Sequence, residues 1–167
     1  MGCNSKPTCY GAAVPEADGS CSIARTLEVI GDRWTMLILR DAFRGVRRFD
    51  QIQRDLGIAR NLLTDRLQKL VDHEVLERRL YQTRPERYEY RLTRKGVDLS
   101  PALVALMRWG DTWLCGDPGP PLELTHDVCG DVLDQQFICW SCDQTVAPAA
   151  IRSRPGPGAE RHQQEIA

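Results

Sequence analysis

The feature that most limits the fold of this chain is a pair of helical patterns joined by a very short turn. A short helix is expected from Asp50 to Gly57, and a longer one over residues 60–73. Apolar residues recur at helical spacing on one face of the longer segment: Leu63, Leu67, Leu70 and Val71. Two helices connected this closely have the spacing of a helix-turn-helix.

Two strand patterns follow the second helix directly. Residues 75–81 are rich in β-forming side chains, and residues 88–92 alternate apolar and polar side chains as a half-buried strand does. The polar segment 82–87 contains Pro85 and suits the turn between them. A two-stranded hairpin directly after a helix-turn-helix is a wing. The expected fold is therefore mainly α with a small β-wing (α+β), a winged helix-turn-helix.

Further helical patterns flank this unit on both sides. One helix is expected over residues 23–30, and a second begins after Asp32, whose side chain can cap it. On the far side, Thr93 is expected to cap a final helix that Pro101 bends and that ends near Leu114.

Composition divides the rest of the chain into smaller parts. The segment 116–121 is rich in glycine and proline and cannot continue a helix, so it makes a linker. Both ends lack apolar periodicity. The predicted organisation is a flexible arm (1–20), the winged helix-turn-helix with dimerisation helices (21–115), a linker (116–123), a small zinc-ribbon-like cysteine and histidine module (124–152) and a disordered tail (153–167).

The distribution of charge matters more than its sum. The formal net charge is −1, which by itself argues against a nucleic-acid binder. Residues 22–114, however, hold 18 Lys and Arg against 13 Asp and Glu, a net of +5, while the remainder carries −6. Residues 40–95 alone reach +6. A basic body with acidic ends is compatible with contacts to a phosphate backbone.

The exposed face of the 60–73 helix carries the side-chain types that read bases. Arg, Asn and Gln match donor and acceptor patterns in the major groove, and Arg84 and Arg87 flank the expected wing tip. The alternative is an ordinary α+β domain with a solvated charged face. The candidate DNA-binding residues are Arg60, Asn61, Thr64, Asp65, Gln68, Lys69, Arg84 and Arg87.

The seven cysteines do not form a simple secreted disulfide framework, because their number is odd. No signal peptide is evident at the N-terminus, so a reducing, cytoplasmic location is expected. Cys21 precedes the first helix, whose N-terminal amides would favour a thiolate and hence redox sensing. The alternative is a small, partly buried capping residue. Cys3, Cys9 and Cys115 receive no role.

Four residues near the C-terminus have the spacing of zinc ligands: His126, Cys129, Cys139 and Cys142. Two residues separate the members of each pair, as in the two halves of a zinc ribbon. About thirty residues cannot build a sufficient core alone, so a metal or docking on the main body is required. A structural zinc ion is the expectation, and an empty thiol cluster or a Cys139–Cys142 disulfide is the alternative.

The chain also resembles a known family, the HxlR transcription regulators, over roughly residues 21–114. The matching segments are Cys21 to Leu27, Ile30 to Thr35, Leu37 to Arg40, Phe49 with Ile52, Gly57-Ile58, Leu63-Thr64, Arg66-Leu67, Tyr90 to Gly96 and Trp109-Gly110. The family implies a winged helix-turn-helix related to the MarR regulators, homodimers and binding of operator DNA. Several members sense electrophiles or oxidants at the position of Cys21, and some carry a similar tail. Here Ala59 stands where the family usually has Ser, which removes a cap worth about 1 kcal/mol.

Together these observations predict a sequence-specific regulator that binds double-stranded operator DNA as a homodimer, with cysteine as its redox or electrophile sensor. A small-molecule or oxidant inducer fits this class. The first and last helices would form the dimer, although their apolar residues could instead complete one core. The alternative function is a protein-interaction module whose cysteine-rich tail recruits a partner. An enzyme is not expected, because phosphate-loop, nucleophile-elbow and zinc-protease motifs are absent, and no segment approaches the length of a membrane span.

Overall fold

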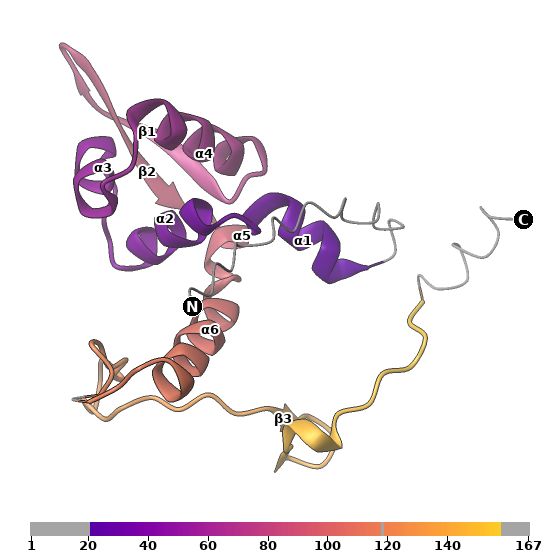
Figure 1. The fold of residues 1–167 in the computed structure, drawn as a ribbon. Coiled ribbons are helices and arrows are strands. Elements are labelled where there is room, and N and C mark those ends of the chain that lie inside the picture. Colours follow the sequence, from indigo (N-terminus) through magenta and orange to yellow (C-terminus); the bar gives the residue numbers. More distant parts are fainter. Residues whose placement is uncertain (1–20, 118, 158–167) are drawn as a thin grey trace, which may run out of the picture.

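The computed structural model describes residues 21–117 and 119–157 (Figure 1). The expected N-terminal arm and most of the expected C-terminal tail lie outside these residues. The chain runs through four helices, a hairpin, two more helices and a small C-terminal unit. The helices and strands are α1 (Ser22–Ile30), α2 (Arg33–Phe43), α3 (Phe49–Leu56), α4 (Arg60–Asp72), β1 (Leu76–Thr83), β2 (Glu86–Leu92), α5 (Arg94–Val97), α6 (Ser100–Trp113), β3 (Ile138–Cys139) and β4 (Gln144–Thr145).

Helices α2, α3 and α4 and the start of the hairpin share one hydrophobic core. Its buried side chains come from these elements and from the segments that join them: Ile38, Leu39, Ile52, Ile58, Leu63, Leu67, Leu70, Val75 and Leu76, together with Ile30 at the end of α1. The members from α4 are those that the helical spacing placed on its apolar face, apart from Val71, which is half-buried. The opposite face of α4 is thereby left to solvent.

The helix-turn-helix is formed by α3 and α4, as predicted. Gly57 ends α3 in the left-handed region at φ +60°, a conformation that glycine adopts without steric cost. Ala59 precedes α4 and offers no side-chain hydrogen bond to the helix, which is the consequence expected where a serine is missing. Three residues therefore suffice to turn the chain from one helix into the next.

The wing is longer than the sequence pattern predicts. Strands β1 and β2 pair antiparallel from Leu76 opposite Leu92 to Thr83 opposite Glu86, with a register shift between Leu80 and Gln82. The expectation of a six-residue turn is therefore wrong, since only residues 84–85 connect the strands. Backbone pairing is indifferent to side-chain polarity, so the ladder continues through the polar residues. The hairpin projects beyond α3 and α4 (Figure 1).

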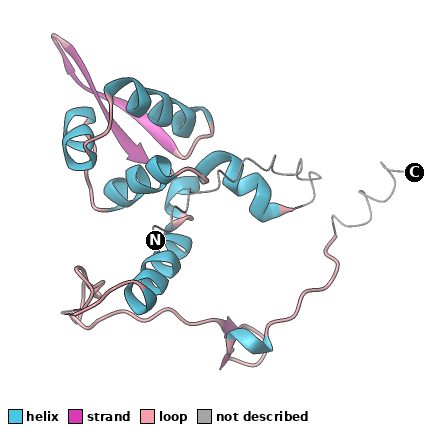
Figure 2. Ribbon diagram, viewed as in Figure 1, coloured by secondary structure: helices cyan, strands magenta, loops and turns pink. Residues whose placement is uncertain are grey.

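The single bent helix expected after the wing is also wrong, because the chain forms two helices (Figure 2). Thr93 caps the first of them, α5, by accepting a hydrogen bond from the Gly96 N–H at 3.1 Å. Helix α6 then begins at Ser100, with Pro101 in its first turn, where a missing N–H costs nothing. Proline marks the start of a new helix here and does not bend an existing one.

Helix α6 contains no buried residue within this single chain. The segment after it returns along the helix: the Gln135 amide donates to the Pro101 carbonyl at 2.9 Å, and Arg108 lies 3.7 Å from Asp134. Strands β3 and β4 pair in a two-residue ladder beyond this contact. The C-terminal unit is thus attached to α6 through its first half.

Candidate nucleic-acid interface

The first turns of α4 present a polar, solvent-facing surface. Arg60, Asn61, Thr64, Asp65 and Gln68 are all exposed, which places five of the six predicted α4 residues on the face away from the core. The Thr64 hydroxyl donates to the Arg60 carbonyl at 3.0 Å, and the Gln68 amide donates to Asp72 at 2.7 Å. The side chains nearest the start of the helix are thus available to base edges and phosphates.

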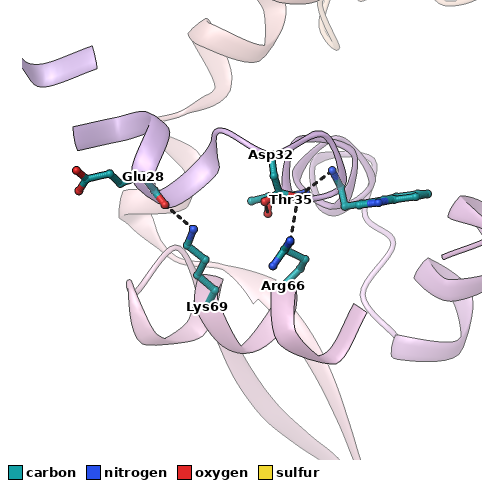
Figure 3. A network of polar contacts seen from close by, with 6 residues as sticks. Glu28, Asp32, Thr35, Arg66 and Lys69 are labelled. Atoms are coloured by element: carbon teal, nitrogen blue, oxygen red, sulfur yellow. Dashed lines mark hydrogen bonds and ion pairs between the residues drawn. The ribbon is translucent and has the colours of Figure 1, made fainter. Parts of the chain in front are cut away.

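Lys69, the sixth predicted residue, is placed differently. Its ammonium group donates to the Glu28 carbonyl oxygen in α1 (Figure 3). Lys69 therefore ties the end of α4 to α1, two helical turns away from Arg60 and Asn61. Its predicted contact with DNA is not supported by this position.

Asp32 holds α4 against α2 from behind the exposed face. Its carboxylate accepts hydrogen bonds from the Trp34 and Thr35 amides, both at 3.1 Å, and forms an ion pair with Arg66 at 3.0 Å (Figure 3). Partial burial opposes ionisation, but the bonds from Thr35 and the charge of Arg66 outweigh it and lower the pKa of Asp32. The capping of α2 expected from the sequence is confirmed, and the same carboxylate also orients α4.

The wing tip carries Arg84 and Arg87 as predicted. Both side chains are exposed: Arg84 lies in the two-residue connection between β1 and β2, and Arg87 is the second residue of β2. The Gln82 amide donates to the Arg84 carbonyl at 3.0 Å, which closes the tip. Two arginines at the end of a projecting hairpin have the placement of minor-groove or phosphate contacts.

Three arginines at this surface, Arg60 and two not yet described, stack on aromatic rings. The guanidinium carbon of Arg60 lies 5.1 Å from the centroid of the Phe49 ring, that of Arg48 lies 4.7 Å from the Tyr81 ring, and that of Arg78 lies 3.6 Å from the Tyr88 ring. Such contacts orient a guanidinium group without neutralising it. The charges between α3, α4 and the wing are therefore held in place while they remain positive.

Arg48 and Arg78 are candidate backbone contacts that the sequence reasoning missed. The cluster of Arg44, Arg47 and Arg48 before α3 was a visible signal, because it contains no acidic residue. Arg78 offered no comparable signal, since its stacking partner lies on the other strand of the hairpin.

Cys21 occupies the N-cap position of α1 as an exposed free thiol. Its side chain makes no capping hydrogen bond, so the alternative of a partly buried capping residue is wrong. Exposure at a helix N-terminus is the setting in which cysteines react with oxidants.

The four predicted zinc ligands form two separate pairs. His126 Nδ1 lies 3.3 Å from Cys129 Sγ. Hydrogen bonds from the backbone of Cys142 and Ser141, and the neighbouring Cys142 side chain, lower the pKa of the Cys139 thiol. Among the residues that the structure describes, no three His, Cys, Asp or Glu side chains gather closely enough to hold a metal ion. Each pair is brought together, and the two pairs are not.

A helix-turn-helix followed by a basic hairpin defines the winged helix-turn-helix class. The comparisons agree: residues 29–117 match the model of the HxlR-like helix-turn-helix family. This chain belongs to the HxlR family. The expected membership is confirmed.

The similarity to known proteins extends beyond the helix-turn-helix itself. An HTH-type transcriptional regulator of Mycobacterium tuberculosis is 48% identical over 137 residues, covering 82% of this chain and 87% of that protein. The crystal structure of PA1607, described as a transcription factor, superposes with a TM-score of 0.74 at 37% identity, covering 82% of this chain and 96% of that one. The redox regulator HypR in its reduced form superposes with a TM-score of 0.52 at 29% identity, covering 55% of this chain and 92% of HypR.

These relatives establish the general class of activity. The family and its members are transcriptional regulators with a DNA-binding helix-turn-helix, and this chain is not an enzyme. In the part of the chain that is described, no helix has the length and apolar content needed to cross a membrane.

Proposed function

We propose that the protein is a homodimeric regulator that recognises a specific double-stranded operator with α4 and grips the adjacent backbone with its wing. The observation that carries this proposal is the common exposure of Arg60, Asn61 and Gln68 on α4 and of Arg84 and Arg87 at the wing tip. Amide side chains on a recognition helix discriminate bases, and arginines on a hairpin supply affinity that does not depend on sequence. A cytoplasmic location, where DNA is accessible, is part of the proposal.

The homodimer is supported by the apolar surface that one chain leaves open. Ile23 and Leu27 on α1, and Leu106, Trp109 and Trp113 on α6, are each more than half exposed. In the described part of one chain, the core therefore leaves Ile23, Leu27, Leu106 and Trp113 exposed, whereas Leu103 packs against it. Covering them with the same helices of a second copy would create a two-fold dimer with two recognition helices.

A redox response through Cys21 is supported by its exposed place at the start of α1. Since α1 contributes to the proposed dimer surface, adding an oxygen or a bulky group to the Cys21 sulfur would alter the packing of that helix between the two chains. An oxidant or electrophile is thus the proposed inducer.

Binding to DNA is tested with the promoter region beside the protein's own gene, by electrophoretic mobility shift at stated salt concentrations. Arg84→Ala is expected to weaken binding to specific and random duplexes alike, because it removes a backbone contact. The slope of log K against log salt should fall by about one unit. Asn61→Ala provides the contrast, since losing a base contact should cost about 1–3 kcal/mol on the preferred site and little on random DNA.

Two results would contradict these assignments. An Arg84→Ala protein with unchanged affinity and salt slope would remove the wing from the interface. If the unmodified protein bound none of the neighbouring promoters specifically, an interaction module that acts through its cysteine-rich tail would be favoured over a regulator.

The sensing proposal predicts that Cys21→Ser keeps its affinity for the operator after oxidant treatment, while the parent protein loses affinity. The substitution removes the reactive sulfur and preserves size and hydrogen bonding. Binding is measured before treatment, after a hydroperoxide or diamide, and after reduction by dithiothreitol. Cys115→Ser is the control, because this cysteine follows α6, outside α1, and its sulfur lies 3.9 Å from Asp111. Equal loss of binding by parent and Cys21→Ser would end the proposal.

A further inference from the structure

The two halves of the C-terminal unit share one backbone geometry. In the first, the Gly130 N–H donates to the His126 carbonyl at 2.8 Å, and in the second the Asp143 N–H donates to the Cys139 carbonyl, also at 2.8 Å. Gly130 and Asp143 are both in the left-handed region, at φ +77° and +54°. A short antiparallel pairing flanks each turn, between Thr125 and Val132 and between β3 and β4. The chain thus forms the same tight turn twice, each time with two ligand-type residues three positions apart.

The spacing within each turn suits a tetrahedral metal ion. Zinc bonds of about 2.1 Å to nitrogen and 2.3 Å to sulfur, at the tetrahedral angle, separate the two ligand atoms by about 3.6 Å. His126 Nδ1 and Cys129 Sγ are 3.3 Å apart, which is close to this value. In the second turn, the backbone N–H groups of Ser141 and Cys142 point at the Cys139 sulfur, and the Cys142 side chain lies beside it. Each turn therefore presents two ligand atoms on the same side.

Burial of apolar side chains does not explain why these two turns adopt a defined conformation. The large apolar side chains that surround them are exposed, from Leu133 at 44% to Trp140 at 99%. The other members of this group are Val128, Val132, Phe137 and Ile138. A segment of this size without a core depends on a crosslink or a metal for its stability.

We propose that His126, Cys129, Cys139 and Cys142 of one chain bind a single structural Zn²⁺, which draws the two turns together. The nine residues between the pairs, 130–138, span up to about 30 Å when extended, so the chain between the turns is long enough to let them meet. Each cysteine that ligates the ion releases its thiol proton to solvent. Four protein ligands leave no position open for chemistry, so the role is structural.

The position of the first turn gives the metal site a fixed place on the protein. The Leu133 N–H donates to the Leu124 carbonyl at 2.8 Å, which closes the loop around the turn. Gln135 and Asp134 then contact α6 through the Pro101 carbonyl and Arg108. Zinc binding would therefore order the second turn next to α6, the helix that carries the proposed dimer surface.

The proposal is tested on the full chain by elemental analysis after purification without chelators. We expect one zinc ion per chain in the parent and in Cys115→Ser, and less than a tenth of that in Cys129→Ser and in Cys142→Ser. Cobalt exchanged into the parent should give the intense visible bands of a tetrahedral thiolate site. Because metal content and spectrum do not depend on DNA, this result stands or falls separately from the proposed regulatory function.

Several outcomes would overturn the proposal. The first is a parent protein that contains no zinc after purification and takes up none when Zn²⁺ is added. This outcome can be observed even if the variants fail to fold. A count of five free thiols in place of seven, restored by reduction, would indicate a disulfide instead. Zinc retained by one of the two cysteine variants would confine the site to a single turn.

A site shared between two chains is distinguished by mixing. When differently tagged Cys129→Ser and Cys142→Ser chains are co-expressed and the mixed dimer is isolated, a site within one chain stays empty in both. A site built from the first turn of one chain and the second turn of its partner would instead recover one zinc per dimer. Recovery would overturn the assignment to a single chain.

Discussion

Gly96→Ala is expected to lower the free energy of unfolding by about 3 kcal/mol. A Cβ at this position would overlap the Val75 carbonyl oxygen and lie 2.9 Å from Cδ2 of Leu92. The Val75 carbonyl cannot yield easily, because it is a backbone group that also accepts the Thr93 N–H at 3.1 Å and the Val75 side chain is buried. Alanine would therefore separate α5 from the base of the wing.

The measurement is urea or guanidinium unfolding followed by circular dichroism. One slope of the free energy of unfolding against denaturant concentration is fitted to the parent and the variants. Gly116→Ala is the matched control, because a Cβ there meets no atom within 4 Å, and its effect should stay within about 0.5 kcal/mol. Equal midpoints for Gly96→Ala and the parent would mean that α5 does not pack on Val75 in solution.

The same glycine explains why the break between α5 and α6 could not be predicted from the sequence. Helical periodicity runs through residues 94–113, and Pro101 is compatible with either a bend or a new first turn. The place of α5 is fixed by the close approach of Gly96 to Val75, a contact between residues twenty-one positions apart that the local pattern does not reveal. Local pattern predicts that a helix forms, whereas packing against another element determines where it stops.

The predictions that succeeded depend on local rules. Asp32 caps α2 and Gly57 ends α3 because caps and left-handed turns involve neighbours within a few residues. The exposed face of α4 followed from its apolar spacing in the same way. The length of the wing could not be predicted from local rules, because backbone pairing extends the strands through residues whose side chains do not favour a strand.

The candidate interface also contains residues that local rules predict and one whose role depends on a contact with a distant element. Arg60, Asn61, Arg84 and Arg87 could be chosen from side-chain type and position along one element, and the structure exposes all of them. Lys69 looked equivalent to its neighbours on α4, but its partner is the Glu28 carbonyl, forty-one positions away. A contact of that kind is visible only once α1 and α4 are placed in space.

Leu106→Asp is expected to convert the protein from dimer to monomer and to lower operator affinity by about 100-fold or more. Leu106 is 57% exposed in the single chain, so an aspartate there remains solvated and leaves the monomer folded. In the proposed dimer the same carboxylate would be buried against α1 or α6 of the second copy, without a partner. A penalty of about 3 kcal/mol weakens association more than a hundredfold at a given concentration.

The loss of operator affinity follows from the loss of linkage between two half-sites. A dimer that has bound one half-site holds its second recognition helix at a high effective concentration near the other half-site, an advantage of about 10² to 10⁴ in affinity.

Sedimentation analysis and binding titrations on whole and half operators would measure both effects, the loss of the dimer and the loss of operator affinity. Ile151→Asp is the control, because it adds the same charge at an apolar residue of similar exposure, 49%, outside the proposed dimer helices. A Leu106→Asp protein that stays dimeric and binds the whole operator with parental affinity would show that α6 does not form the dimer. A variant that becomes monomeric yet keeps its half-site affinity would confirm that the exposed α6 surface serves to pair two intact recognition helices.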